Sequence, residues 1–587
     1  MNRKQRRAAP KQSRFPAGHH PPASDPLAQL FQQALRSQEQ NNFPDAVRLY
    51  RRLLAIKPDH AEANNNLGCV LLMQGKSAEA SERFARALTL MPQLFEQFGG
   101  VAATLAAILP PIAEAARRAM AAWPKLLPLD QLLAGAGLGA IAGDPMLLCM
   151  LQSVPARSTP IERVLTSLRA SLLADAATGR PWNEIELAFC CALARQCFIN
   201  EFVFAAEPDE EAQIERLTAL LGETLSAGAA PSPANLPSLL AAIAMYRPLH
   251  QLPFAPALLG RPWPAVVEAV LTQQLREPLQ ELALRASIPR LTAIEDEVSQ
   301  RVRQQYEENP YPRWVHAPGF VTPISIDRHL REKFPASEFT PLGKTEGFDV
   351  LVAGCGTGSQ STGVAQGYLG ARVLAVDLSL SSLCFAKRMT PPSLAAKIDY
   401  LQGDILKLGS VDRSFDMIDC AGVLHHMADP AEGWRVLLSL LRPGGIMHLG
   451  FYSELGRRDV VKARAYIAER GYTSSPADIR RCRQDLLKTP LGGVSRFSDF
   501  FSTSECRDLL LHVQESRLTI PAIKAFIEAN RLSFIGFDLG ANAASNFRTL
   551  FAQNGWSMTD LDRWHAVETQ YPDTFSTMYQ FWVQKPA

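Results

Sequence analysis

Apolar positions follow different patterns in the two halves of the chain. Up to about residue 290, alanine and leucine recur at helical spacing, and prolines such as Pro155 and Pro181 interrupt the pattern. Further on, short continuous apolar runs appear at residues 350–352 and 371–376, and a helical stretch follows each of them. The sequence therefore predicts a helical first half and a second half in which strands alternate with helices.

The first helices repeat with a period of 34 residues. The pairs that recur are Ala46 and Ala80, Tyr50 and Phe84, Leu54 and Leu88, and Pro58 and Pro92. This pattern resembles two tetratricopeptide repeats over residues 27–92, each a helical hairpin that ends at a proline. Two repeats cannot bury a core by themselves, so we expect helices of residues 93–293 to cover them.

A glycine-rich loop follows the apolar run at 350–352. Gly354, Gly356 and Gly358 let the backbone turn tightly and approach a ligand closely. A dinucleotide-binding loop needs glycine or alanine at position 359, where this chain has a serine. The sequence Gly-Cys-Gly-Thr-Gly resembles motif I of the class I S-adenosylmethionine-dependent methyltransferases. Asp377 follows about twenty residues later, where a carboxylate suits the ribose hydroxyls in these and in NAD-binding folds.

Further segments resemble the same family in the same order. Residues 399–405, 415–426 and 441–449 resemble its third, fourth and fifth strands with their loops, and residues 532–538 and 578–583 fit the last two strands. The resemblance implies a Rossmann-like, seven-stranded domain that binds S-adenosylmethionine. The cofactor contacts it implies are Gly354, Cys355, Gly356, Thr357, Gly358, Gln360, Asp377, Leu378, Asp404, Ile405, Ala421 and Gly422.

One position departs from the family pattern. Val352 stands where the family usually carries an acid that anchors the amino-acid end of the cofactor. Gln360 or an upstream residue is a candidate replacement, and a vestigial cofactor fold is the alternative.

An aromatic segment precedes the glycine loop. Asn309, Tyr311, Arg313 and Trp314 lie in a stretch that Pro310 and Pro312 stiffen. Related methyltransferases often lay such a segment over the cofactor, where aromatic faces meet the sulfonium. The alternative is a buried plug between domains.

Candidate catalytic residues follow the fourth strand. His425 and His426 stand where the acceptor meets the cofactor in the family, and an imidazole can accept a proton near neutral pH. Either could instead be structural. His512, in the helical insertion, is a candidate for contact with the acceptor. The ten cysteines show no paired spacing, which predicts no metal site and a reducing, cytoplasmic compartment.

Charge and length limit the other possibilities. The net charge of +2 gives no general attraction to nucleic acid, and no apolar run is long enough to span a bilayer. We expect a disordered basic tail at residues 1–26, the repeats at 27–92, a helical region at 93–293, a connecting helix and the aromatic segment at 294–345, and the methyltransferase domain at 346–587, with a helical insertion at about 452–530.

The resulting hypothesis is a methyltransferase that acts on a protein or other macromolecule recruited by the repeats. A first alternative is a small metabolite or glycan as acceptor, with the repeats used for oligomerisation. A second is a scaffold without enzymatic activity.

Overall fold

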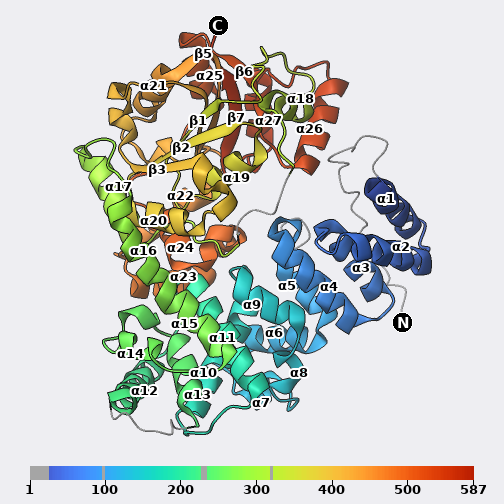
Figure 1. Cartoon of the computed structure of the whole chain (residues 1–587), viewed down its shortest axis with the longest axis vertical. Helices are drawn as coiled ribbons and strands as arrows, with labels where there is room; N and C mark the ends of the chain where they lie inside the picture. Colours follow the sequence, from blue (N-terminus) through green and yellow to red (C-terminus); the bar gives the residue numbers. More distant parts are fainter. Residues whose placement is uncertain (1–25, 96–99, 227–233, 317–321) are drawn as a thin grey trace.

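The computed structural model describes residues 26–95, 100–226, 234–316 and 322–587. The predicted basic tail lies outside them, except for its last residue. In Figure 1 a sheet with its helices lies at the top, a helical region lies at the bottom, and the first four helices lie at the right. In the part of the chain that the structure describes, no helix combines the length and the apolar composition needed to cross a membrane.

The first four helices form two hairpins. They are α1 (Pro26–Glu39), α2 (Phe43–Ile56), α3 (Ala61–Met73) and α4 (Ser77–Leu90). Gly68 allows α3 to approach α4, because a Cβ at this position would lie 2.9 Å from the ring of Phe84. Ser81 on α4 donates a hydrogen bond of 2.8 Å to Asp144, next to α9 (Pro145–Ser153). The second hairpin is therefore covered by a neighbouring helix.

More helices complete the helical half, by which we mean the described residues up to 293. They are α5 (Gly100–Ile108), α6 (Pro110–Ala122), α7 (Leu129–Leu132), α8 (Gly139–Ala142), α10 (Thr159–Ala176), α11 (Glu184–Ile199), α12 (Pro208–Ser226), α13 (Leu236–Ala244), α14 (Ala255–Leu259), α15 (Ala265–Leu271) and α16 (Glu277–Leu284). One apolar core runs through this half from Leu30 in α1 to Leu275 beyond α15.

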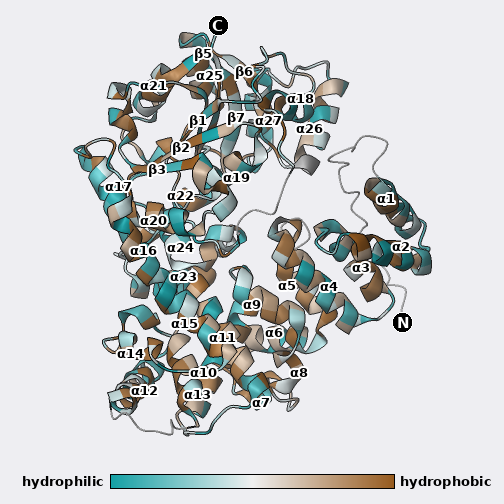
Figure 2. Cartoon of the chain, viewed as in Figure 1, coloured by the Kyte–Doolittle hydropathy of each residue, from teal (hydrophilic) through white to brown (hydrophobic). Residues whose placement is uncertain are grey.

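A seven-stranded sheet forms the second half. Its strands are β1 (Phe348–Ala353), β2 (Ala371–Asp377), β3 (Ile398–Gln402), β4 (Phe415–Ala421), β5 (Leu441–Phe451), β6 (Ser533–Phe537) and β7 (Tyr579–Gln584). They are ordered β3-β2-β1-β4-β5-β7-β6, and β7 runs antiparallel to both of its neighbours. Two separate apolar cores include side chains of β1 and β2, which explains why their runs are almost continuously apolar (Figure 2). The predicted fold class is confirmed.

Helices cover the sheet and connect its strands. Before the sheet come α17 (Glu297–Glu308) and α18 (Ile326–Lys333), and the others are α19 (Ser359–Gly367), α20 (Leu380–Met389), α21 (Pro430–Leu440), α25 (Ile520–Ala529), α26 (Ala541–Gln553) and α27 (Leu561–Gln570). Since the carboxyl ends of the parallel strands share one edge, the loops after β1, β2, β3 and β4 meet there.

Three insertion helices after β5 pack toward the helical half. They are α22 (Arg458–Glu469), α23 (Pro476–Leu487) and α24 (Thr503–Leu511), and they lie between the sheet and the helical half in Figure 1. Their apolar side chains belong to the same core as those of α10 and α11. Arg483 of α23 pairs with Glu162 of α10 at 2.6 Å, and both side chains are buried. The insertion therefore joins the two halves.

Candidate functional site

The glycine loop has a backbone that other residues adopt poorly. Gly354 and Gly358 have φ angles of +75° and +83°. A Cβ at Gly354 would lie 2.4 Å from a methyl group of Val423, and a Cβ at Gly358 would lie 2.6 Å from that of Ala386. Both positions therefore require glycine, because the φ angle is positive and because there is no room for a Cβ atom.

Asp377, at the end of β2, supports this loop. Its two carboxylate oxygens accept backbone N–H groups from Gly356 and Ser379, each at 2.8 Å. Burial raises the pKa of Asp377 to about 6. Each carboxylate oxygen can still accept a second hydrogen bond, so Asp377 can bind the two ribose hydroxyls expected from the sequence.

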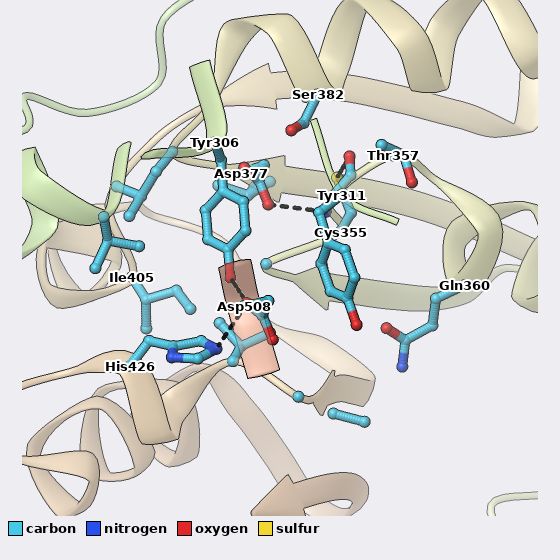
Figure 3. A pocket seen from close by; sticks show the side chains of 18 of the residues that line it. Tyr306, Tyr311, Cys355, Thr357, Gln360, Asp377, Ser382, Ile405, His426 and Asp508 are labelled. Carbon is cyan, nitrogen blue, oxygen red and sulfur yellow. Dashed lines mark hydrogen bonds and ion pairs between the residues drawn. The ribbon is translucent and has the colours of Figure 1, made fainter. Parts of the chain in front are cut away.

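A cavity of about 390 Å³ opens in front of the loop (Figure 3). Of the residues predicted to contact cofactor or acceptor, its lining contains Tyr311, Gly354, Cys355, Gly356, Thr357, Gln360, Asp377, Leu378, Asp404, Ile405, Ala421, Gly422 and His426. Gly358, His425, His512, Asn309, Arg313 and Trp314 lie outside this lining. The cavity is thus formed mainly by the loops at the carboxyl ends of β1 to β4.

Asp404 gives the cavity an unused hydrogen-bond acceptor. Its Oδ1 accepts the N–H of Leu406 at 3.0 Å, whereas its buried Oδ2 has no hydrogen-bond partner among the described residues. Burial raises the pKa of this carboxyl group. A buried acceptor without a partner suits a ligand that brings a donor, such as the adenine amine of S-adenosylmethionine. The residues present therefore fit the expected cofactor.

The missing acid at Val352 has a counterpart on the next strand. Asp419 of β4 is the register partner of Val352, and it is buried. Gln360, which lines the cavity, donates a hydrogen bond of 2.5 Å to this acid, whereas Asp419 itself lies outside the cavity lining. Gln360 could be recognised from the sequence, but Asp419 could not, because strand register is needed to place this acid beside Val352.

The aromatic segment at residues 309–314 is attached to the glycine loop. Thr357 donates a side-chain hydrogen bond to the carbonyl of Pro312, and the indole of Trp314 donates to the carbonyl of Thr357 at 3.0 Å. Only Tyr311 and Pro312 of this segment line the cofactor cavity, whereas Trp314 packs edge-to-face on Phe385. Within this segment, Tyr311 is therefore the aromatic side chain placed to cover a ligand.

Tyr306 and Asp508 form a buried pair that the sequence analysis missed. The Tyr306 hydroxyl donates to Oδ1 of Asp508 at 2.6 Å, and the Tyr452 hydroxyl donates to Oδ2 at 3.3 Å. All three residues line the cavity, and Figure 3 shows Tyr306 and His426 directed toward Asp508. Asp508 comes from α24, so the insertion supplies one wall of the site.

The peptide of Gln514 sets the tautomers of two histidines. Its N–H donates to Nδ1 of His512 at 3.0 Å, and its carbonyl accepts from Nδ1 of His426 at 2.9 Å. Since a peptide N–H can only donate and a carbonyl can only accept, neutral His512 carries its proton on Nε2 and neutral His426 carries it on Nδ1. Burial lowers the pKa of both imidazoles. Nε2 of His426 therefore carries a lone pair, which accepts no hydrogen bond from the described residues and lies 3.9 Å from Oδ1 of Asp508.

His425 occupies a different environment. Its ring stacks on Tyr452 with centroids 3.7 Å apart, and neither ring nitrogen has a hydrogen-bond partner among the described residues. Burial holds the pKa of His425 well below its usual range. His425 therefore packs behind the cavity, while His426 faces it.

His426, Asp508 and His512 are also the donor types of a metal site. Their candidate ligand atoms lie within 4.8 Å of one another. Nε2 of His512, however, carries the proton in the tautomer that Gln514 selects, and it lies 3.2 Å from the Tyr306 hydroxyl. Metal ligation needs a lone pair at that nitrogen. We therefore interpret the cluster as a hydrogen-bond network.

Comparison with known proteins agrees with both halves of this description. Residues 351–449 match the family model of the methyltransferase domain, and residues 38–103 match that of the tetratricopeptide repeat. The chain carries a class I methyltransferase domain and tetratricopeptide repeats. The family predicted from the motifs is confirmed, with S-adenosylmethionine as the cofactor of the methyltransferase domain.

Several relatives show how far the similarity extends. An uncharacterized protein of Synechococcus sp. is 29% identical over 266 residues, which cover 42% of this chain and 61% of that protein. The ubiquinone biosynthesis O-methyltransferase of Xanthomonas axonopodis pv. citri is 31% identical over 156 residues, or 26% of this chain and 61% of that enzyme. The structure of PKMT2 from Rickettsia typhi in complex with AdoHcy is 19% identical, with a TM-score of 0.35, and the match covers 44% of this chain and 53% of that one. The chain thus matches 61% of the length of each of the two curated relatives.

Proposed function

We propose that this protein transfers a methyl group from S-adenosylmethionine to a protein or other macromolecule that its helical half recruits. The observation that carries the proposal is the cavity. Its lining joins the glycine loop, Asp377 and Asp404 to the Nε2 lone pair of His426. One space thus adjoins both a cofactor site and a proton acceptor.

The side chains suggest how each step is assisted. The bound cofactor supplies a methyl group on a sulfonium, which needs an aligned nucleophile. An acceptor that carries a proton transfers it to Nε2 of His426 as the new bond to carbon forms and the carbon–sulfur bond breaks. Asp508 stabilises the resulting imidazolium, while Tyr306 and Tyr452 hold its carboxylate in place. The Gln514 peptide keeps His426 in the productive tautomer.

The proposed role of His426 can be tested by substitution. We expect His426→Ala to lower the rate of methyl transfer by about 10²- to 10⁴-fold, the usual contribution of a general base. Affinity for S-adenosylhomocysteine, measured by calorimetry, should stay within twofold of the wild-type value. His565→Ala, on α27, is the matched control and should leave the rate unchanged. An unchanged rate in His426→Ala would show that His426 does not act as a general base.

A macromolecular acceptor is supported by the architecture. The insertion helices that supply Asp508 pack into the core of the helical half, so the repeats belong to the same body as the site. The relatives named ubiquinone biosynthesis O-methyltransferases favour the alternative, a small acceptor with a hydroxyl group.

One labelling experiment separates these acceptors. Purified protein is incubated with radiolabelled S-adenosylmethionine and cell lysate, and the label is separated into macromolecular and small-molecule fractions. We expect label in the macromolecular fraction, and we expect removal of residues 1–92 to abolish it. Binding of S-adenosylhomocysteine by the shortened chain verifies its fold. Label confined to small molecules, whether or not the repeats are present, would favour the small acceptor.

A further inference from the structure

A second cavity, of about 780 Å³, adjoins the cofactor cavity. Four residues line both of them: Tyr311, Ser359, Tyr452 and Met578. The second cavity is about twice as large as the first. A group that reaches the cofactor from this side passes Tyr311 and Tyr452, close to His426 and Asp508.

Both halves of the molecule form the walls of this interdomain cleft. The helical half contributes apolar side chains that include Leu88, Met150 and Ile161, and the segment before α24 contributes Phe497 and Phe501. Leu88 belongs to α4, the last helix of the repeats. The cleft thus extends from the end of the repeat region to the edge of the cofactor site.

The arginines in the cleft are already paired with acids. Four of them line it, and the pairs are Arg157 with Glu505 at 3.2 Å, Arg313 with Glu201 at 3.4 Å, Arg457 with Glu515 at 2.7 Å, and Arg496 with Asp459 at 2.9 Å. These four positive charges therefore leave little attraction for an acidic ligand.

Asp499 differs from every other charged side chain in the lining. It accepts a hydrogen bond of 2.9 Å from Ser498, and within the described ranges it makes no ion pair. Glu505, on the neighbouring α24, is buried, and its Oε2 has no hydrogen-bond partner among the described residues. Burial raises the pKa of both acids, that of Glu505 to about 7. Arg157 and Arg457 lie near enough to lower the pKa of Asp499 by their charge, but each of these arginines forms its ion pair with a glutamate, Glu505 and Glu515 respectively.

We propose that the cleft binds the acceptor as a protein segment and that Asp499 pairs with a lysine or arginine side chain of that segment. The inference rests on the proposed function and names the chemistry of its acceptor. Apolar walls with one unpaired acid fit a peptide that combines apolar side chains with a cation. Because the cleft begins at the repeats, a segment bound there continues toward the methyl donor.

Three peptides that differ only at their central residue provide the test. Fluorescein-labelled Gly-Ala-Leu-Ala-Xaa-Ala-Leu-Ala-Gly, with lysine, norleucine or glutamate as Xaa, is titrated into the full chain saturated with S-adenosylhomocysteine. Fluorescence anisotropy should show the lysine peptide binding about tenfold more tightly than the norleucine peptide, as one charged hydrogen bond predicts, and the glutamate peptide binding most weakly.

Two variants assign the effect to the cleft. Asp499→Asn should abolish the preference for lysine, whereas Asp412→Asn, an exposed acid on the opposite side of the sheet, should preserve it. Equal affinities for the three peptides, no binding of any peptide, or an unchanged preference in Asp499→Asn would overturn the proposal. Displacement of the lysine peptide by hexylammonium at equal concentration would also overturn it, in favour of a small amine. Calorimetry measures the binding of S-adenosylhomocysteine in parallel. If this binding is retained while the peptides fail, the failure concerns the cleft and not the cofactor site.

Discussion

The ability of Asp377 to accept hydrogen bonds from the cofactor depends on its protonation state. Its pKa of about 6 lies above the usual value because the carboxylate is buried. In the folded state the proton is therefore held more tightly than in the unfolded state, so acid does not destabilise the fold through this residue. Acid instead removes a charged acceptor from the ribose hydroxyls.

We therefore expect affinity for S-adenosylhomocysteine to fall as the pH decreases through about 6. Calorimetric titrations between pH 5 and pH 8 measure this dependence. Asp377→Asn should weaken binding at least tenfold at pH 7.5, since a charged hydrogen bond contributes roughly 1.5–3 kcal/mol, and should flatten the pH profile. Asp412→Asn should behave like the wild type. A variant that keeps its pH dependence would show that another group titrates.

Short-range residue patterns predicted the residues that we propose to hold the cofactor, and the structure brings most of them to one cavity. Gly354, Gly356 and Asp377 follow the two apolar runs, and Asp404 lies in a segment that resembles the family; all four line the cavity, whereas Gly358 does not. The proton-accepting half could not be predicted in the same way. Tyr306 and Asp508 are 202 positions apart in the sequence. The two histidines are oriented by the backbone peptide of Gln514, and a backbone contact cannot be recognised from the type of residue at that position.

Among the elements, the aromatic segment at residues 309–314 has two faces with different functions. Tyr311 faces the cofactor cavity, while Trp314 faces the interdomain cleft and the glycine loop. Prolines and aromatic residues predicted a stiff segment near the cofactor. They could not predict which ring covers the ligand, because that depends on how Thr357 anchors the backbone.

Tyr311→Leu should therefore separate the cationic cofactor from its neutral product. Loss of an aromatic face near the sulfonium should weaken S-adenosylmethionine binding by roughly two- to fivefold, corresponding to 0.5–1 kcal/mol, and should leave S-adenosylhomocysteine binding almost unchanged. Trp314→Leu should change both affinities by the same factor. Calorimetry with both ligands gives the ratio for each variant. An equal loss for both ligands in Tyr311→Leu would argue for packing alone.

At the scale of the whole molecule, the insertion makes the two halves one structural unit. The sequence predicted helices between the fifth and sixth strands, but their apolar faces did not reveal that they pack on α10 and α11. The buried pair of Arg483 and Glu162 crosses this contact, and Arg483 also donates to the carbonyl of Val203.

Removal of one partner from this pair should affect the stability of the whole chain. We expect Glu162→Gln to lower the free energy of unfolding by about 3–5 kcal/mol, because it leaves a buried arginine without its counter-charge. Glu79→Gln, which breaks the exposed pair with Arg51, should cost less than about 1 kcal/mol. Denaturant titrations followed by fluorescence compare the two. If both variants lose a similarly small free energy of unfolding, the ion pair between the two halves contributes little to stability.

α24 has one end in each part of the protein. Its first turn is held by Asn200 and Glu201, which follow α11, and its last turn carries Asp508, which lines the cofactor cavity. Because α24 is a short helix held at both ends, a displacement of its first turn also displaces its last turn. A partner that pushes α11 by even a fraction of an ångström would also move the carboxylate that steadies the His426 imidazolium. A partner bound against α11 would then change the rate of turnover without contacting the methyl group.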